Sequence, residues 1–87
     1  MAYGYAVINT AGLILAANPQ RLSLIIVNSG SDRLHFGQDA SVSTACPYLL
    51  PDGSLTEDSG GQKVYCGPFY GITTGGSAIA YYWERIR

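Results

Sequence analysis

The sequence predicts an all-β fold, either a small antiparallel β-sandwich or a jelly-roll-like barrel of about seven or eight short strands. Three observations lead to this prediction: apolar residues alternate in short runs, turn residues separate these runs at spacings of about 8–12 residues, and almost no segment has the length and period of a helix. The 87 residues are expected to form one domain, residues 1–87. A chain this short often needs extra stabilisation from a disulfide, a metal or partner subunits.

The clearest strand is predicted over residues 21–28, directly after a turn at Asn18 and Pro19. Pro19 fixes its own φ angle and lacks the N–H group that a central strand needs, so the strand begins after it. Because side chains alternate along a strand, one face carries Leu22, Leu24 and Ile26 and the other carries Ser23, Ile25 and Val27. Both faces are mostly apolar, so we expect this strand to be covered on both sides, as in a sandwich or at a subunit contact.

Two hairpins are predicted in the first half of the chain. Residues 5–8 and 13–16 are expected to pair across a turn at 9–12, where a glycine can supply a positive φ angle. The strand at 21–28 is followed by a loop rich in Ser and Gly and a short strand at 34–37, which we expect to return antiparallel to it.

The second half begins with a segment at 38–61 that reads mostly as loop, with a short strand at 48–50. A further strand is predicted at 62–66. The chain then ends in a predicted hairpin of residues 69–73 and 77–86, because a Gly-Gly pair between two β-rich runs is a strong hairpin signal.

The last predicted strand contains most of the aromatic candidates for function. It places Ile79, Tyr81 and Trp83 on one face and Ala78, Ala80 and Tyr82 on the other. The expected core consists of Leu22, Leu24, Ile26, Ile79 and Trp83. Three interpretations of the aromatic group stay open: core, subunit interface, or a platform that stacks on sugar rings. The candidate interaction residues are Tyr70, Tyr81, Tyr82, Trp83, Arg21 and Glu84, and the last two either pair with each other or contact a neighbouring molecule.

The composition favours a surface that contacts other proteins over one that binds nucleic acids. Charged residues make up 13% of the chain, the net charge is −1 and there are seven tyrosines, whereas a typical domain is about a quarter charged. The five basic residues do not form the stripe that phosphate binding needs, so we expect no nucleic-acid partner. The uncharged first twenty residues are interrupted by polar residues, which argues against a signal peptide or a membrane span and predicts a soluble product of the cytoplasm.

Metal and cofactor sites are not predicted. Cys46, Cys66 and His35 are the only cysteines and the only histidine, fewer than the four ligands of a structural zinc site. The two cysteines can form a disulfide or remain two buried thiols, and a cytoplasmic environment favours the thiols.

Catalysis is also not predicted. Asp32 and Asp39 flank His35 in the sequence, but no serine stands in a nucleophile turn such as G-x-S-x-G. We therefore expect a protein that is not an enzyme.

The arrangement of turns and strands resembles that of small virion proteins of tailed bacteriophages. Residues 17–28, in which Asn18-Pro19 precedes Arg21 and an apolar strand, are followed by a Ser/Gly turn and a short strand ending at Gly37, as in the opening of such proteins. The second half is similar in its turn at 50–53, its run Gly67-Pro68-Phe69-Tyr70-Gly71-Ile72-Thr73 and its final strand containing Glu84. The residues around 44–47 and the two cysteines depart from this pattern.

This resemblance, which covers residues 17–84, implies a small β-sandwich that decorates or cements a capsid, or that forms the base of a head fibre or spike, commonly as a trimer. It implies a major capsid protein or another virion protein as the partner, and location in the virion after synthesis in the host cytoplasm. We therefore expect a non-enzymatic virion structural protein that acts as a symmetric oligomer. The alternative is a carbohydrate-binding or host-recognition module that uses Trp83 and Tyr81.

Overall fold

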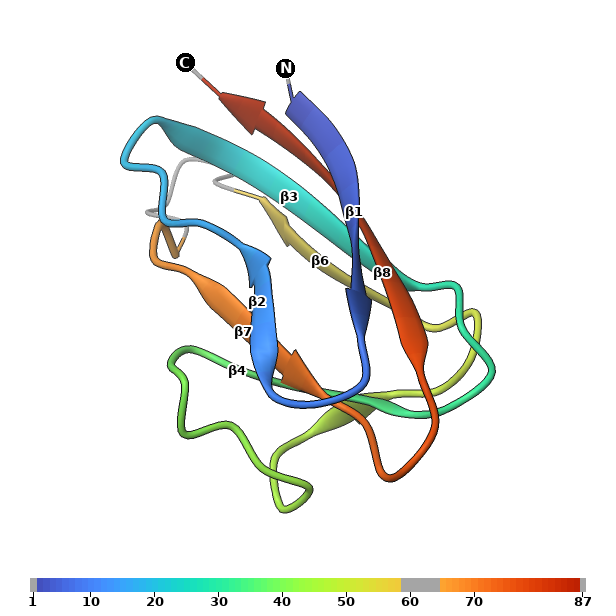
Figure 1. Ribbon diagram of the computed structural model, residues 1–87. Coiled ribbons are helices and arrows are strands. Elements are labelled where there is room, and N and C mark those ends of the chain that lie inside the picture. The colour runs from blue at the N-terminus through green and yellow to red at the C-terminus, as the bar shows by residue number, and fades with distance from the viewer. Residues whose placement is uncertain (1, 59–64, 87) are drawn as a thin grey trace.

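The computed structural model describes residues 2–58 and 65–86, and these residues form eight β-strands in two four-stranded antiparallel sheets (Figure 1). The strands are β1 (Ala2–Ile8), β2 (Gly12–Leu15), β3 (Arg21–Asn28), β4 (Leu34–Gly37), β5 (Tyr48–Leu49), β6 (Ser54–Asp58), β7 (Phe69–Ile72) and β8 (Ala78–Ile86). This arrangement confirms the predicted all-β fold. Within the described residues there is no helix of the length and apolar character needed to cross a membrane.

The strand pairs are nested. β1 pairs with β8, β2 with β7, β3 with β6 and β4 with β5, as if the chain were folded in half at the β4–β5 connection. Two further pairings, β3 with β8 and β4 with β7, join these pairs into sheet 1, of order β1-β8-β3-β6, and sheet 2, of order β2-β7-β4-β5. Nested pairing of eight strands in two sheets is the arrangement of a jelly roll.

The three predicted hairpins, β1 with β2, β3 with β4 and β7 with β8, are wrong. In each case the turn carries the chain from one sheet to the other (Figure 1). Turn residues permit this crossing as readily as a hairpin. After β3, for example, Ser29 donates a backbone hydrogen bond to the carbonyl oxygen of Ile79, and a Cβ atom at Gly30 would lie only 2.4 Å from the Cα of Ala78. The absence of a side chain at Gly30 allows the chain to cross over the start of β8.

The middle of the chain is more regular than the sequence suggests. The predicted short strand at 48–50 is confirmed as β5, but β6 lies inside the segment that was expected to be loop. Strand β6 has only one apolar residue, Leu55, because it is an edge strand and much of its surface is exposed. Of the strand predicted at 62–66, residues 62–64 lie outside the described residues, and Tyr65 and Cys66 are not in a strand.

The core fills the space between the two sheets. It is formed by Ile8, Ile14, Leu15, Leu24, Ile26, Leu34, Phe69, Ala78 and Ala80. Leu24 and Ile26 are confirmed as core residues, but Leu22 and Ile79 are only half-buried and Trp83 is exposed.

Two features explain why the predicted core was partly wrong, although the division of residues 78–83 into two faces is confirmed. In β3, the pairing register with β8 shifts between Arg21 and Ser23, so the alternation that would bury Leu22 is broken and Arg21 is buried instead. In β8, the inward face carries Ala78, Ala80 and Glu84, and the bulkier Ile79, Tyr81 and Trp83 therefore face outward.

Candidate interaction surface

Arg21 and Glu84 pair with each other inside the sandwich. The Nε atom of Arg21 donates to Oε2 of Glu84 at 2.7 Å, and the two side chains are 0% and 7% exposed. Nη1 also donates to the carbonyl oxygens of Tyr65 and Gly67, and Nη2 donates to that of Ala16, at 2.8–2.9 Å. The pair thus links the segments after β2 and before β7 to sheet 1. Of the two alternatives from the sequence, pairing with each other or contact with a neighbouring molecule, the structure shows the pairing.

The outer face of sheet 1 carries a strip of exposed apolar side chains, which we call the aromatic face. Its most exposed members are Tyr3 (82%), Tyr5 (64%), Val7 (59%), Tyr81 (48%) and Trp83 (46%). The pairing of β1 with β8 sets Tyr3 opposite Trp83 and Tyr5 opposite Tyr81, and the rings of Tyr5 and Tyr81 lie 5.7 Å apart. The strip is therefore continuous across the two strands.

The aromatic face continues onto β3 with little charge. Trp83 lies opposite Ile25 and Tyr81 lies opposite Val27, and both aliphatic side chains are half-buried. Arg85, at the end of β8, is the one charged side chain on this face among the residues whose side chains are described. At roughly 200 Å² for a fully exposed ring, the four aromatic side chains expose about 500 Å², near the upper end for the largest apolar patch of a monomer.

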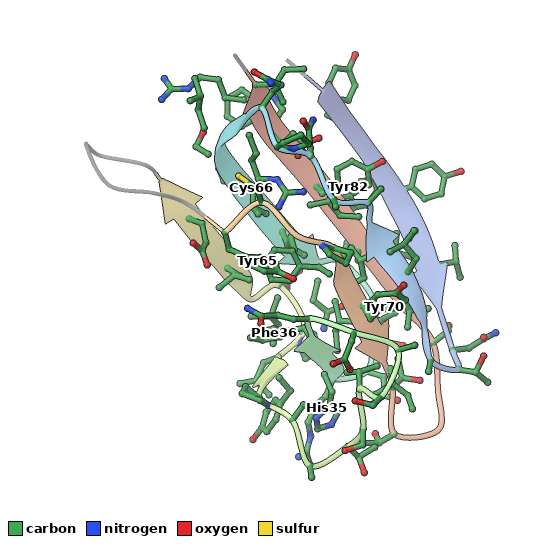
Figure 2. The ribbon with its side chains drawn as sticks, turned by 90° about the vertical axis from the view of Figure 1, so that its left-hand side faces the viewer. His35, Phe36, Tyr65, Cys66, Tyr70 and Tyr82 are labelled. Carbon is green, nitrogen blue, oxygen red and sulfur yellow. The ribbon has the colours of Figure 1, made fainter. Side chains whose placement is uncertain are left out.

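The structure brings together only part of the predicted set of interaction residues. Tyr81 and Trp83 share the aromatic face, whereas Tyr82 points inward and packs against the core. Tyr70 lies on β7 in sheet 2, where it pairs with Leu13 (Figure 2). Alternation along β8 separates Tyr82 from its neighbours, and the division into two sheets separates Tyr70.

Sequence reasoning missed Tyr3 and Tyr5, although they are the most exposed rings of the aromatic face. The expected first strand began at residue 5, whereas β1 begins at Ala2. The signal was present in the sequence, because Tyr3, Tyr5 and Val7 alternate with the small residues Gly4 and Ala6.

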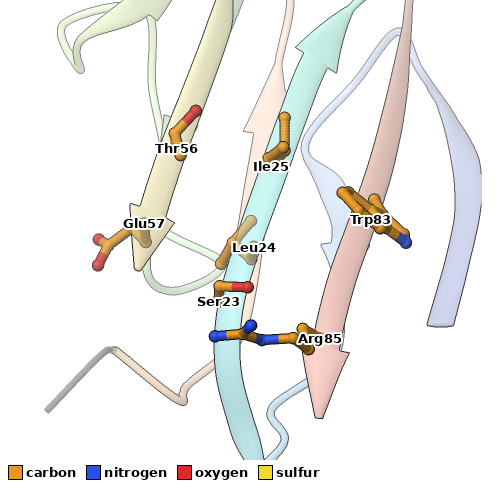
Figure 3. Close-up of a pocket in the computed structure, with 7 residues that line it drawn as sticks. All are labelled: Ser23, Leu24, Ile25, Thr56, Glu57, Trp83 and Arg85. Carbon is orange, nitrogen blue, oxygen red and sulfur yellow. The ribbon is translucent and has the colours of Figure 1, made fainter. Parts of the chain in front are cut away.

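A shallow groove of about 220 Å³ lies beside the aromatic face (Figure 3). Trp83 and Arg85 of β8 line one side, and Thr56 and Glu57 of β6 line the other; Ser23, Leu24 and Ile25 of β3 complete the lining. The groove is smaller than most ligand pockets, but it combines an aromatic ring with hydroxyl and guanidinium groups, while the carboxylate of Glu57 points away from Trp83 (Figure 3).

His35 is buried on β4, where it contacts Cys46 and Tyr48. Its Nδ1 atom donates to the carbonyl oxygen of Cys46 at 2.9 Å, and its Nε2 atom is buried with no hydrogen-bond partner among the described residues. The rings of Tyr48 and His35 pack against each other, with their centroids 5.1 Å apart. The flanking carboxylates are engaged elsewhere, since Asp32 accepts from the Gly76 backbone N–H and Asp39 accepts from Ser41.

These hydrogen bonds also act on the two aspartates directly. Donation by the backbone N–H of Gly76, followed by that of Arg33, lowers the pKa of Asp32. The side-chain hydroxyl of Ser41, followed by its backbone N–H, lowers the pKa of Asp39. Both effects favour ionised carboxylates that hold turns in place.

The two cysteines lie toward opposite ends of the sandwich (Figure 2). Cys46 adjoins His35, and the Sγ atom of Cys66 lies 3.7 Å from the carbonyl oxygen of Arg21. Both are half-buried. No group of three or more potential metal-binding side chains occurs in residues 2–58 and 65–86.

Comparisons of this chain with protein-family models, with curated proteins and with solved structures find no match.

Proposed function

We propose that this protein is a non-enzymatic structural component of a bacteriophage virion. It binds a major capsid protein or another virion protein as a symmetric oligomer, and stabilises or decorates the capsid as a cement protein, a decoration protein or the base of a head fibre. The observation that carries this proposal is the aromatic face, an exposed apolar strip on a chain with few charges.

The size of the aromatic face suits binding through many weak, repeated contacts. At about 25 cal/mol per Å², covering about 500 Å² provides roughly 12 kcal/mol before the costs of association. Those costs are about 4–15 kcal/mol, so one copy binds weakly by this contact. Copies joined in a symmetric oligomer on a repeating shell bind together much more strongly.

The fold agrees with the proposal but does not carry it. Jelly rolls occur in viral capsid proteins and also in lectins, so the architecture alone selects neither function. The resemblance of residues 17–84 to small phage virion proteins adds the virion as the expected setting.

The test is electron microscopy of phage particles made with and without this chain. Particles that lack it should lose a regular density on the capsid, neck or tail, and supplying the wild-type chain should restore it. Trp83→Lys, which places a charge on the aromatic face, should not restore the density. Leu50→Lys is the matched control, because Leu50 is an exposed apolar residue outside this face. Absence of the chain from purified particles would overturn the proposal.

A second candidate function is carbohydrate binding or host recognition, and the groove beside Trp83 is the observation that favours it. A sugar ring could stack on the indole while hydroxyl and charged groups bind its oxygens. Glycan-array binding by the wild-type chain should then be lost in Trp83→Ala, with the circular dichroism spectrum unchanged. A wild-type chain that binds no glycan would exclude this function.

A further inference from the structure

Strand β1 is an edge of sheet 1, and it lacks the features that normally protect an edge. Its seven residues, Ala2–Ile8, contain no charged residue and no proline. Among the described residues, no strand pairs with the side of β1 that faces away from β8. An exposed, apolar edge of this length is a template for pairing with another strand.

The other three sheet edges differ from β1. Strand β6, the opposite edge of sheet 1, carries Glu57 and Asp58. In sheet 2, β2 has four residues and an irregular register between Leu13 and Leu15, and β5 has only two residues. Charge, irregularity and shortness are the usual means of preventing edge pairing. Within residues 2–58 and 65–86, the unprotected edge is therefore confined to β1.

We propose that β1 pairs antiparallel with β1 of a second copy of this chain, about a twofold axis at Tyr5. Sheet 1 would then continue into a sheet of eight strands. This inference rests on the proposed function in one respect: it identifies a second copy of the chain as the partner that binds at β1, the edge strand of the aromatic face. A second copy fits because the strand is complementary to itself: the register centred on Tyr5 pairs all of its residues, and no like charges meet.

The pairing extends the existing rows of side chains. Tyr5 already lies beside Tyr81, and across the axis it meets Tyr5 of the partner subunit. In the same register Tyr3 meets Val7 of the partner subunit. On the inward face between these positions, Gly4 lies opposite Ala6 of the partner subunit.

The area available predicts a weak dimer. The outward side chains of Tyr3, Tyr5 and Val7 expose about 400 Å² per copy, and strand pairing covers only the parts of them that turn toward the partner, so they contribute less than about 800 Å² to the pair besides the backbone edge. This contribution lies below the roughly 1,200–2,000 Å² of stable specific interfaces. We therefore expect a monomer–dimer equilibrium with a dissociation constant in the micromolar range, and Tyr81 and Trp83 stay exposed on the enlarged face.

The first experiment is sedimentation equilibrium of the wild-type chain from micromolar to millimolar concentration. The expected result is a reversible shift from 9.3 kDa to twice that mass. Tyr5→Lys should weaken the dimer at least tenfold, because two ammonium groups would meet at the axis. Leu50→Lys adds the same charge at another exposed apolar position and should leave the equilibrium unchanged. Circular dichroism checks that each variant folds.

A charge-swap experiment tests the position of the axis. Tyr5→Lys and Tyr5→Glu should each be monomeric alone, whereas an equimolar mixture should dimerise again, because the two opposite charges meet only where position 5 lies opposite itself. Dimerisation of the wild type without recovery in the mixture would overturn this register.

Other outcomes separate this inference from the proposed function. A wild-type chain that stays monomeric at all concentrations, or that forms a trimer, overturns the β1 pairing, and its presence in phage particles would still support the virion function. A dimer that responds to Tyr5→Lys but never enters particles supports the pairing and overturns the virion function.

Discussion

Replacement of Arg21 by methionine should strongly destabilise the fold. Met keeps much of the length of the side chain but removes the guanidinium group, so the Glu84 carboxylate stays buried without its cation. The carbonyl oxygens of Ala16, Tyr65 and Gly67 also lose their donors. Removing one partner of a buried ion pair costs about 3–5 kcal/mol. A domain of 87 residues has a total stability of about 4–13 kcal/mol, so the loss is a large fraction of it.

Urea unfolding followed by far-ultraviolet circular dichroism measures this effect. Arg21→Met should lower the midpoint with little change in the slope, or leave the chain unfolded without urea. The double variant Arg21→Met/Glu84→Leu should be more stable than Arg21→Met alone, because it removes the unpaired buried carboxylate. A loss below about 1 kcal/mol in Arg21→Met would refute this reasoning. The reasoning would also be refuted if the double variant lost as much unfolding free energy as Arg21→Met and Glu84→Leu lose together when measured singly.

Three further predictions concern the core, a close packing contact and the response to acid. Leu24→Ala should lower the free energy of unfolding by about 2–5 kcal/mol in the same assay, because Leu24 is 1% exposed. Gly30→Ala should cost about 1–3 kcal/mol, since the added Cβ would lie 2.4 Å from the backbone Cα of Ala78; an unchanged unfolding midpoint would contradict this. The lowered pKa of Asp32 means that its ionised form stabilises the fold: the contribution is present above the ordinary pKa of 3.8 and disappears as the pH falls through the lowered value. Below about pH 4, thermal unfolding should therefore show a loss of stability in the wild type that is smaller in Asp32→Asn.

The fold class could be predicted because its signals are local. The turn at Asn18-Pro19, the alternation along residues 21–28 and the glycine-rich turns each depend on a few neighbouring residues. Strand β6 was not predicted, because an edge strand with one apolar residue has no clear alternating pattern. The hairpins were wrong because the same turn residues suit a hairpin and a crossing between sheets.

The candidate site was only partly predictable for a similar reason. Tyr81 and Trp83 were singled out from the sequence, but their aromatic character suits a core, an interface or a ligand platform equally well. Their exposure depends on which face of β8 turns inward, and Glu84 on the opposite face is held inside by Arg21. Their proximity to Tyr3 and Tyr5 depends on the pairing of β1 with β8.

The sequence by itself determined that this protein is a small β protein with short strands and a surface poor in charge. These properties follow from alternation, turn chemistry and composition, which act over a few residues or over the chain as a whole. The tertiary structure alone decided the nested order of the strands, the inward face of β8 and the assembly of the aromatic face. The physical reason is that these depend on contacts between distant residues, such as the ion pair of Arg21 and Glu84, which are 63 positions apart in the chain.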